Sequence, residues 1–278
     1  MNFDKMFKDE REKGETPLRQ CQLVLTRMFK IFDYLCAKHH IQYFLCNGSL
    51  LGAVRNRGIL PWDDDIDIGL TRRNYERFVE LAVPDLSEDI FFQIPETDPD
   101  YPPCHIVEAK LRDKYSSYTL PKNRKDGRHT GLMLDLIVYD RAYLPHNLFI
   151  YAMNKMLIFF FKKKGDKKRA GMLKWIERCS PIKLVYSCSG LCQWKKIRKG
   201  PNFFKEKEIS KLLKVPFEDT AASIPGGWHT YLKRKHGPGY IQPPIEKQVT
   251  KHGEGVPDAF RPSNHRHTLV WSERNKVL

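Results

Sequence analysis

The chain has 278 residues, which is enough for one large domain or for a domain with an appended lobe. Apolar residues make up 41% of the sequence and aromatic residues 12%, so the chain can bury a substantial core and wholesale disorder is excluded. The formal net charge of +15 favours anionic partners, namely phosphorylated small molecules, nucleic acid or an anionic membrane surface, and charge alone does not choose among them.

The N-terminal part of the sequence predicts one long helix followed by alternating strands and helices. Residues 17–40 carry apolar side chains at three- and four-residue spacing, which is typical of an amphipathic helix. Residues 41–45 then predict a buried strand, 49–55 a short helix and 66–70 a second strand.

The same alternation continues to the middle of the chain. Thr71 is expected to cap a further helix, which ends at Pro84. Extended stretches follow at 90–94, 105–112 and 132–139. Strands that alternate with helices in this way predict an α/β (α+β) fold, with a mixed sheet and flanking helices.

The second half of the sequence has a different character. From about residue 145 onward, the pattern predicts helices rich in lysine and arginine. We therefore expect a single domain over 1–278, with a core at about 17–140, a helical basic part at about 145–260 and a loosely held polar tail at 262–278.

The acidic run at 61–69, Pro-Trp-Asp-Asp-Asp-Ile-Asp-Ile-Gly, carries the strongest chemical signal. The two-residue period of a strand places Asp65 and Asp67 on one face and the intervening isoleucines on the other. Two neighbouring carboxylates repel each other unless a cation lies between them. The run therefore predicts a hard divalent metal or a raised pKa.

A glycine-serine pair lies shortly before this run. Gly48 and Ser49 follow the predicted strand and open the predicted short helix, where free backbone N–H groups can bind an anion. Arg55, near the end of that helix, is a candidate for a bidentate contact to a phosphate. A surface arginine is the ordinary alternative.

A third carboxylate lies in the apolar stretch 131–138, where Asp135 is the one charged residue. A buried carboxylate requires a cationic partner, and either a metal or a lysine would serve. Because a metal-binding pair is already expected upstream, we favour the metal.

The run from Tyr43 to Phe78 resembles the LicD family, which includes the bacterial phosphorylcholine transferases. This family is similar to the catalytic domains of fukutin and fukutin-related protein, within the nucleotidyltransferase superfamily. The resemblance lies in Asn-Gly-Ser-Leu-Leu-Gly-Ala-Val-Arg and in Pro-Trp-Asp-Asp-Asp-Ile-Asp-Ile, and it extends more thinly to 109–113, 131–136 and 228–247.

The resemblance implies a transferase of substituted phosphate groups. Such an enzyme moves a phosphocholine-like, phosphoethanolamine, aminoalkyl-phosphonate or polyol phosphate group from a cytidine-linked nucleotide donor and releases cytidine monophosphate. The implied acceptor is a sugar hydroxyl of a cell-surface glycan or of its lipid-linked precursor. Carried over to this chain, Asp65 and Asp67 are the metal pair and Asp135 is the third ligand, and the all-oxygen set suits Mg²⁺ or Mn²⁺.

Four further residues are candidates for roles in this transfer. Lys110 and Arg112 lie in a stretch that resembles the family's basic strand, and their alternation lets both face the donor phosphates. Asp63 or Asp64 can accept the proton of the acceptor hydroxyl. We favour Asp63, which shares a strand face with Asp65 if the strand begins that early.

Residues 148–161 are strongly apolar, and the basic clusters 162–164 and 167–169 follow them directly. This composition is typical of an interfacial anchor on an anionic leaflet. A buried helix packed on the sheet explains it equally well. The glycan acceptors of the resembling family favour membrane contact.

The sequence also suggests a compartment. The seven cysteines are scattered and form no repeated CxxC pair, which favours free thiols in a reducing environment. Residues 1–15 are charged and lack the apolar segment of a secretory signal. No stretch reaches the roughly 20 apolar residues of a membrane span. We expect a cytoplasmic protein, peripheral on the inner face of the membrane.

Two other functions compete with this one. A glycosyltransferase could use Asp65 and Asp67 for the metal of a nucleotide sugar, although such enzymes usually carry the pair after several Rossmann-like strands. A basic membrane- or nucleic-acid-binding protein with a relic site is the other alternative, and the intact trio of aspartates argues against it. No nucleic-acid-binding signature is present, so nucleic acid is not an expected partner.

Overall fold

A mixed β-sheet forms the centre of the described structure. In the computed structural model, the residues described are 3–101, 107–119, 127–142, 156, 185–187, 203–242 and 255–276. The strands of the central sheet are β1 (Phe44–Leu45), β2 (Ile66–Thr71), β3 (Ile90–Gln93), β4 (Ala109–Asp113), β6 (Met133–Ala142), β7 (Val185–Ser187) and β8 (Phe203–Lys205). Two smaller strand pairs are β5 (Ser117–Thr119) with β11 (Val256–Asp258), and β9 (Leu212–Phe217) with β10 (Thr220–Pro225).

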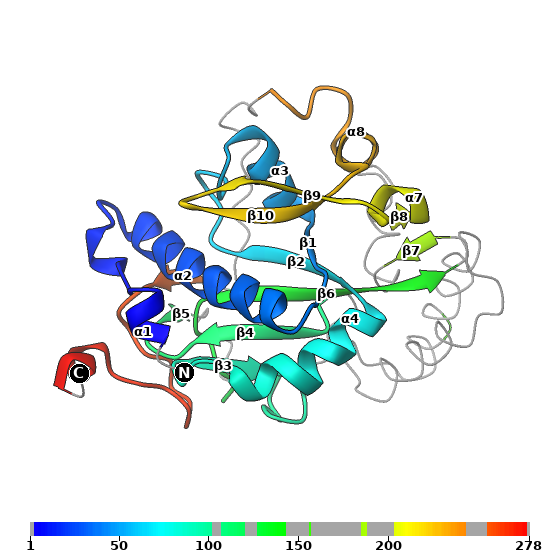
Figure 1. The fold of residues 1–278 in the computed structure, drawn as a ribbon. Coiled ribbons are helices and arrows are strands. Elements are labelled where there is room, and N and C mark those ends of the chain that lie inside the picture. Colours follow the sequence, from blue (N-terminus) through cyan, green and yellow to red (C-terminus); the bar gives the residue numbers. More distant parts are fainter. Residues whose placement is uncertain are drawn as a thin grey trace.

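The central sheet has the order β1-β2-β6-β4-β3, with β7 beside β6 and β8 beside β7 (Figure 1). Strands β2 and β6 are parallel, and the other neighbours are antiparallel. The predicted α/β class with a mixed sheet is therefore confirmed. The sheet places β2 and β6 side by side at its centre, which decides where their aspartates lie.

Helix α2 (Pro17–Lys38) confirms the long helix predicted at 17–40. The Thr16 hydroxyl accepts a hydrogen bond from the Arg19 backbone N–H at 3.1 Å, and Pro17 occupies the first turn, where no amide donor is required. The apolar stripe of α2 is buried, and the helix contacts β6 (Figure 1). The helix ends at a residue with a left-handed backbone, His40 with φ 53°.

The other predicted elements of the first half are present with shifted ends. The remaining helical segments are α1 (Phe3–Met6), η1 (Arg11–Lys13), α3 (Asn47–Arg55), α4 (Arg72–Arg77), the π-helical turn η2 (Phe78–Ala82), η3 (Val83–Asp85), α7 (Glu206–Ile209), α8 (Trp228–His236) and η7 (Trp271–Lys276). The Thr71 hydroxyl caps α4 by accepting from the Asn74 backbone N–H at 3.4 Å, as predicted.

Among the described residues of the second half, the range 203–242 contains strands where the sequence suggests helices. Strands β9 and β10 form an antiparallel hairpin from Leu212 to Pro225, where the sequence pattern predicts helix. Phe217, Ala222 and Ile224 of this hairpin are buried in the main core, and the Glu218 carboxylate joins it to α2 through Arg19 at 2.7 Å. Burial against the core therefore outweighs the local composition.

The polar C-terminal segment is packed against the domain, where the sequence predicts a loosely held tail. The buried Arg274 guanidinium pairs with Asp9 at 2.6 Å and also contacts Asp4 near the N-terminus. The His265 ring centroid lies 5.0 Å from that of His129 and 5.2 Å from that of Phe91. These contacts join residues that are far apart in sequence, so local polarity does not reveal them.

The described ranges contain no helix that is both long and apolar enough to cross a membrane. The apolar and basic segment at 148–169 lies outside the described residues, apart from Met156. Its predicted role in membrane contact therefore stays a prediction.

Candidate active site

Three aspartates meet at the centre of the sheet. Parallel pairing of β2 with β6 places Asp67 directly opposite Asp135, and Asp65 lies just before β2 begins. One carboxylate oxygen from each of the three lies within 4.8 Å of the others. The isoleucines that alternate with them are fully buried on the opposite face, as the strand period predicts.

The electrostatics of this cluster call for a cation. Burial, followed by the charges of Asp67 and Asp135, raises the pKa of Asp65 well above its ordinary value. Burial and the charge of Asp135 raise the pKa of Asp67 to about 7. Three converging oxygen donors suit Mg²⁺ or Mn²⁺, so Asp65, Asp67 and Asp135 fit a divalent metal site.

Lys110 lies at the edge of the cluster. It pairs in register with Asp135 across β4 and β6, and its ammonium group lies 2.6 Å from the Asp135 carboxylate. From the sequence, a lysine and a metal were alternative partners for the Asp135 carboxylate. The structure has room for both, because Lys110 contacts one oxygen of Asp135 while Asp135 also belongs to the aspartate cluster. Lys110 therefore fixes the orientation of this carboxylate next to the other two.

The position of Arg112 corrects the expectation that it faces the donor phosphates. Its side chain is fully buried. The guanidinium donates to the Gln93 side-chain oxygen at 2.7 Å and to the Gly131 carbonyl at 2.7 Å. Arg112 lies two residues beyond Lys110 on β4, where β3 and the loop before β6 enclose its side chain. Arg112 therefore makes buried structural contacts with Gln93 and Gly131.

Gly48 and Ser49 lie inside the first turn of α3 rather than in a turn before it. The Ser49 hydroxyl accepts a hydrogen bond from the Asp67 backbone N–H at 2.8 Å and so ties α3 to β2. A Cβ atom on Gly48 would lie 2.9 Å from an Asp63 carboxylate oxygen. The pair therefore positions two aspartates of the site, and the absence of a side chain at Gly48 makes room for Asp63.

Asp63 and Asp64 precede the first residue of β2, so the strand does not begin early enough to align Asp63 with Asp65 by strand period. Burial raises the pKa of each carboxylate to about 6, and the charge of Arg55 partly opposes this for Asp63. A carboxylate with a pKa near 6 is a suitable proton acceptor near neutral pH. The two remain alternative candidates for the base.

Arg55 lies near Asp63 and over the Trp62 ring. Its guanidinium carbon is 5.2 Å from the ring centroid, and its Nη1 donates to the Gln242 carbonyl at 3.4 Å. This stacking restricts the arginine to the side of the site formed by α3 and the Asp-rich loop. Arg55 is thus placed beside Asp63, and its predicted contact to a phosphate stays a prediction.

Two residues of the site were not identified from the sequence. Asn47, with φ 49°, and Lys235 of α8 both favour the ionised form of Asp67, through a hydrogen bond and through charge, and so oppose the rise of its pKa. The Lys235 ammonium and the Tyr231 hydroxyl both donate to the Asn47 side-chain oxygen, the hydroxyl at 3.2 Å. In sequence Lys235 is one of several neighbouring basic residues, and no local pattern distinguishes it from Lys233.

Comparisons with known proteins find related sequences. A family model described as LicD/FKTN/FKRP, nucleotidyltransferase domain, matches residues 40–92. A lipopolysaccharide cholinephosphotransferase LicD of Haemophilus influenzae is 27% identical over 267 residues, which cover 84% of this chain and 96% of that protein. The resemblance to the LicD family is therefore confirmed, and its matched part contains Asp63, Asp65 and Asp67.

Two further matches are shorter. An uncharacterized protein of Rickettsia typhi is 41% identical over 59 residues, which are 21% of this chain and 19% of that protein. An uncharacterized protein of Rickettsia prowazekii is 42% identical over 67 residues, which are 24% of this chain and 23% of that protein. These two matches add no information on activity.

The raised pKa of Asp67 predicts how a neutral replacement changes stability. In the folded chain this pKa is about 7, above the ordinary value of 3.8, so the folded state loses stability as the pH rises between these values. With EDTA present, Asp67→Asn should therefore raise the free energy of unfolding by roughly 1–3 kcal/mol at pH 8, and by less at pH 5. Urea denaturation at the two pH values measures this.

The matched control is Asp140→Asn on the neighbouring strand β6. Asp140 pairs with Arg72 at 2.8 Å outside the cluster, so its replacement should lower stability. A loss of stability in Asp67→Asn like that of the control would mean that Asp67 serves as a structural ion-pair partner.

Proposed function

We propose that this protein is a metal-dependent phosphotransferase that moves a phosphorylated small group from a cytidine nucleotide to a sugar hydroxyl of a glycan or of its lipid-linked precursor. The observation that carries the proposal is the convergence of Asp65, Asp67 and Asp135 within the segments that resemble LicD. The relative in Haemophilus influenzae is described as a lipopolysaccharide cholinephosphotransferase, which supports this substrate class.

In this proposal the three aspartates hold Mg²⁺ or Mn²⁺, which supplies charge neutralisation at the phosphate oxygens when bound. Lys110 keeps the Asp135 carboxylate in place through its 2.6 Å contact. Asp63 or Asp64 accepts the proton of the attacking sugar hydroxyl. Arg55, beside Asp63, and Lys235, beside Asn47, are the cations that bind the donor phosphates.

Release of cytidine monophosphate tests the proposal. The purified chain should release it from at least one member of a panel of cytidine-linked choline, ethanolamine, aminoalkyl-phosphonate and polyol donors when a glycan acceptor and Mg²⁺ are present. Excess EDTA should abolish release, and added Mg²⁺ should restore it. Asp135→Asn should be inactive, whereas Asp219→Asn, which changes an exposed acid, should retain full activity.

Turnover that persists in excess EDTA would contradict metal dependence. Transfer from a nucleotide sugar, with no release from any cytidine-linked donor, would favour the glycosyltransferase instead. Inactivity with every donor, together with a folded protein that binds no divalent ion, would favour a binding protein with a relic site.

Lys235 provides a second test, at a residue that lies far from the aspartates in sequence. Because its ammonium group lies beside Asn47 and attracts Asp67, its loss should remove one donor-binding charge. Lys235→Met should lower kcat/KM by about a hundredfold while leaving the melting temperature within a few degrees of wild type. Lys233→Met, an exposed lysine on the same helix, is the control and should be unchanged. Equal activity in both variants would remove Lys235 from the site.

We also propose that the segment 148–169 attaches the protein to anionic membranes, because its sequence joins an apolar stretch to clusters of lysine and arginine. Each basic residue near an anionic surface contributes about 1 kcal/mol that salt screens. The full chain should therefore co-sediment with anionic vesicles at low salt and dissociate as salt rises.

Phe159→Ser should weaken this binding without a change in melting temperature. A large fall in melting temperature, with no vesicle binding by wild type, would indicate a core segment.

A further inference from the structure

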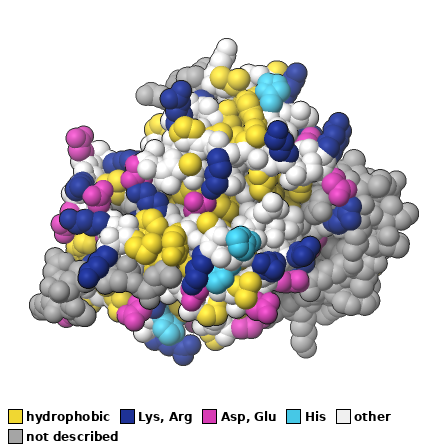
Figure 2. Space-filling view, viewed as in Figure 1, with side chains coloured by type: hydrophobic (Ala, Val, Ile, Leu, Met, Phe, Trp, Pro, Cys, Tyr) yellow, Lys and Arg dark blue, Asp and Glu magenta, His cyan; other side chains and the backbone are white. Residues whose placement is uncertain are grey.

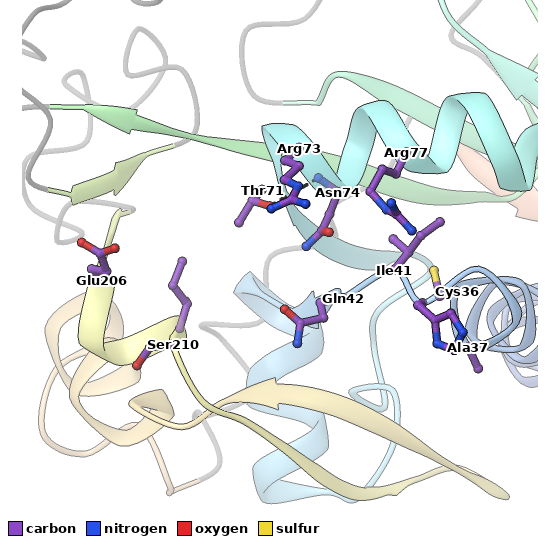
Figure 3. A pocket seen from close by; sticks show the side chains of 12 residues that line it. Cys36, Ala37, Ile41, Gln42, Thr71, Arg73, Asn74, Arg77, Glu206 and Ser210 are labelled. Atoms are coloured by element: carbon purple, nitrogen blue, oxygen red, sulfur yellow. Dashed lines mark hydrogen bonds between the residues drawn. The ribbon is translucent and has the colours of Figure 1, made fainter.

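A polar pocket of about 790 Å³ lies at the far end of β2 from the carboxylate cluster (Figure 3). Its walls come from the end of α2, the loop leading to β1, the start of α4 and helix α7. Thr71, on this pocket, and Asp67 are four residues apart on one strand, which corresponds to roughly 13 Å. The pocket is therefore separate from the candidate active site, and its volume lies within the range of small-molecule sites.

The charged side chains of this pocket favour an anion. Arg73 and Arg77 of α4 carry permanent positive charges on one wall. The acidic lining residue, Glu206, pairs with Arg141 at 2.8 Å, so its charge is already balanced. Basic side chains also surround two histidines near the middle of the face shown in Figure 2. An anion in the pocket meets a net positive surface.

Several polar groups of the pocket have no partner in the described part of the chain. Among the residues that the structure describes, the side chains of Arg73, Asn74 and Gln42 make no hydrogen bond and no ion pair. In Figure 3, Arg73 and Asn74 extend from α4 toward the space that Gln42 faces from the opposite wall. A guanidinium and two amides thus converge on one volume with all their hydrogen-bonding capacity available.

The end of helix α2 places His40 on the wall of the pocket. The end of α2 closes with hydrogen bonds from the Ile41 N–H to the Cys36 carbonyl at 2.8 Å and from the His40 N–H to the Ala37 carbonyl at 3.2 Å. This helix ending places His40 at φ 53°, a position that glycine occupies with least strain. The chain instead has an imidazole there, on the wall of the pocket.

We propose that this pocket binds a phosphate-bearing, hydroxyl-rich anion. The Arg73 guanidinium supplies the charged, planar donor set that suits a phosphate, and Arg77 adds a second charge on the same wall. The amides of Gln42 and Asn74 both donate and accept, which suits hydroxyl groups. This binding needs neither a divalent metal nor the carboxylate cluster, so it is independent of the proposed transfer reaction.

Titration calorimetry with sn-glycerol 3-phosphate, in EDTA and at low salt, tests the proposal. Wild type should bind the probe, and Arg73→Gln should bind it at least roughly tenfold more weakly, because a charge-assisted contact is lost. Arg73 is exposed and has no side-chain partner among the described residues, so its replacement is expected to leave the fold intact. Arg261→Gln, which changes another exposed arginine outside the pocket, is the matched control and should bind as wild type does.

Two further measurements separate the source of the ligand and the site of binding. Co-sedimentation with phosphatidic acid vesicles that depends on Arg73 indicates a lipid headgroup, whereas binding of the soluble probe alone indicates a free phosphate ester. Asp67→Asn should bind the probe as wild type does. The proposal is overturned if wild type shows no binding, if Arg73→Gln and Arg261→Gln weaken it equally, or if Asp67→Asn abolishes it.

Discussion

Repulsion among three carboxylates is the constraint around which the described structure is organised. The parallel register of β2 and β6 places Asp67 opposite Asp135, and Asp65 joins them at the start of β2. Without a cation the three cannot all be ionised at low cost, as the raised pKa values of Asp65 and Asp67 show. A packed sheet that retains this arrangement loses stability in exchange for a cluster of oxygen donors that suits a divalent ion.

The surrounding elements hold that arrangement in place. Lys110 pairs with Asp135 from β4, and Ser49 ties α3 to the backbone of Asp67. Lys235 of helix α8 lies 188 residues after Asn47 in the sequence, and the fold brings its ammonium group to the Asn47 side chain, next to Asp67. The second half of the chain therefore contributes Lys235 to the site. The family match at 40–92 does not include this residue.

The sequence predicted the central part of this structure because its signals there are local. The period of two in the Asp-rich run predicted that Asp65 and Asp67 share a face, and the lone charge of Asp135 in an apolar strand marked the third carboxylate. Contacts between distant segments left no such signal. Arg112 alternates with Lys110, yet the enclosing loop at Gly131 makes it an interior residue. The β9–β10 hairpin and the docking of Arg274 likewise depend on tertiary contacts rather than on local pattern.

The most direct test of the central claim is the position of a bound ion. Crystals soaked in Mn²⁺ should show one anomalous-difference peak between the carboxylates of Asp65, Asp67 and Asp135, and crystals of Asp67→Asn should lack it. A peak elsewhere with none among these three aspartates, or an unchanged peak in the variant, would contradict the account of this cluster as a metal site.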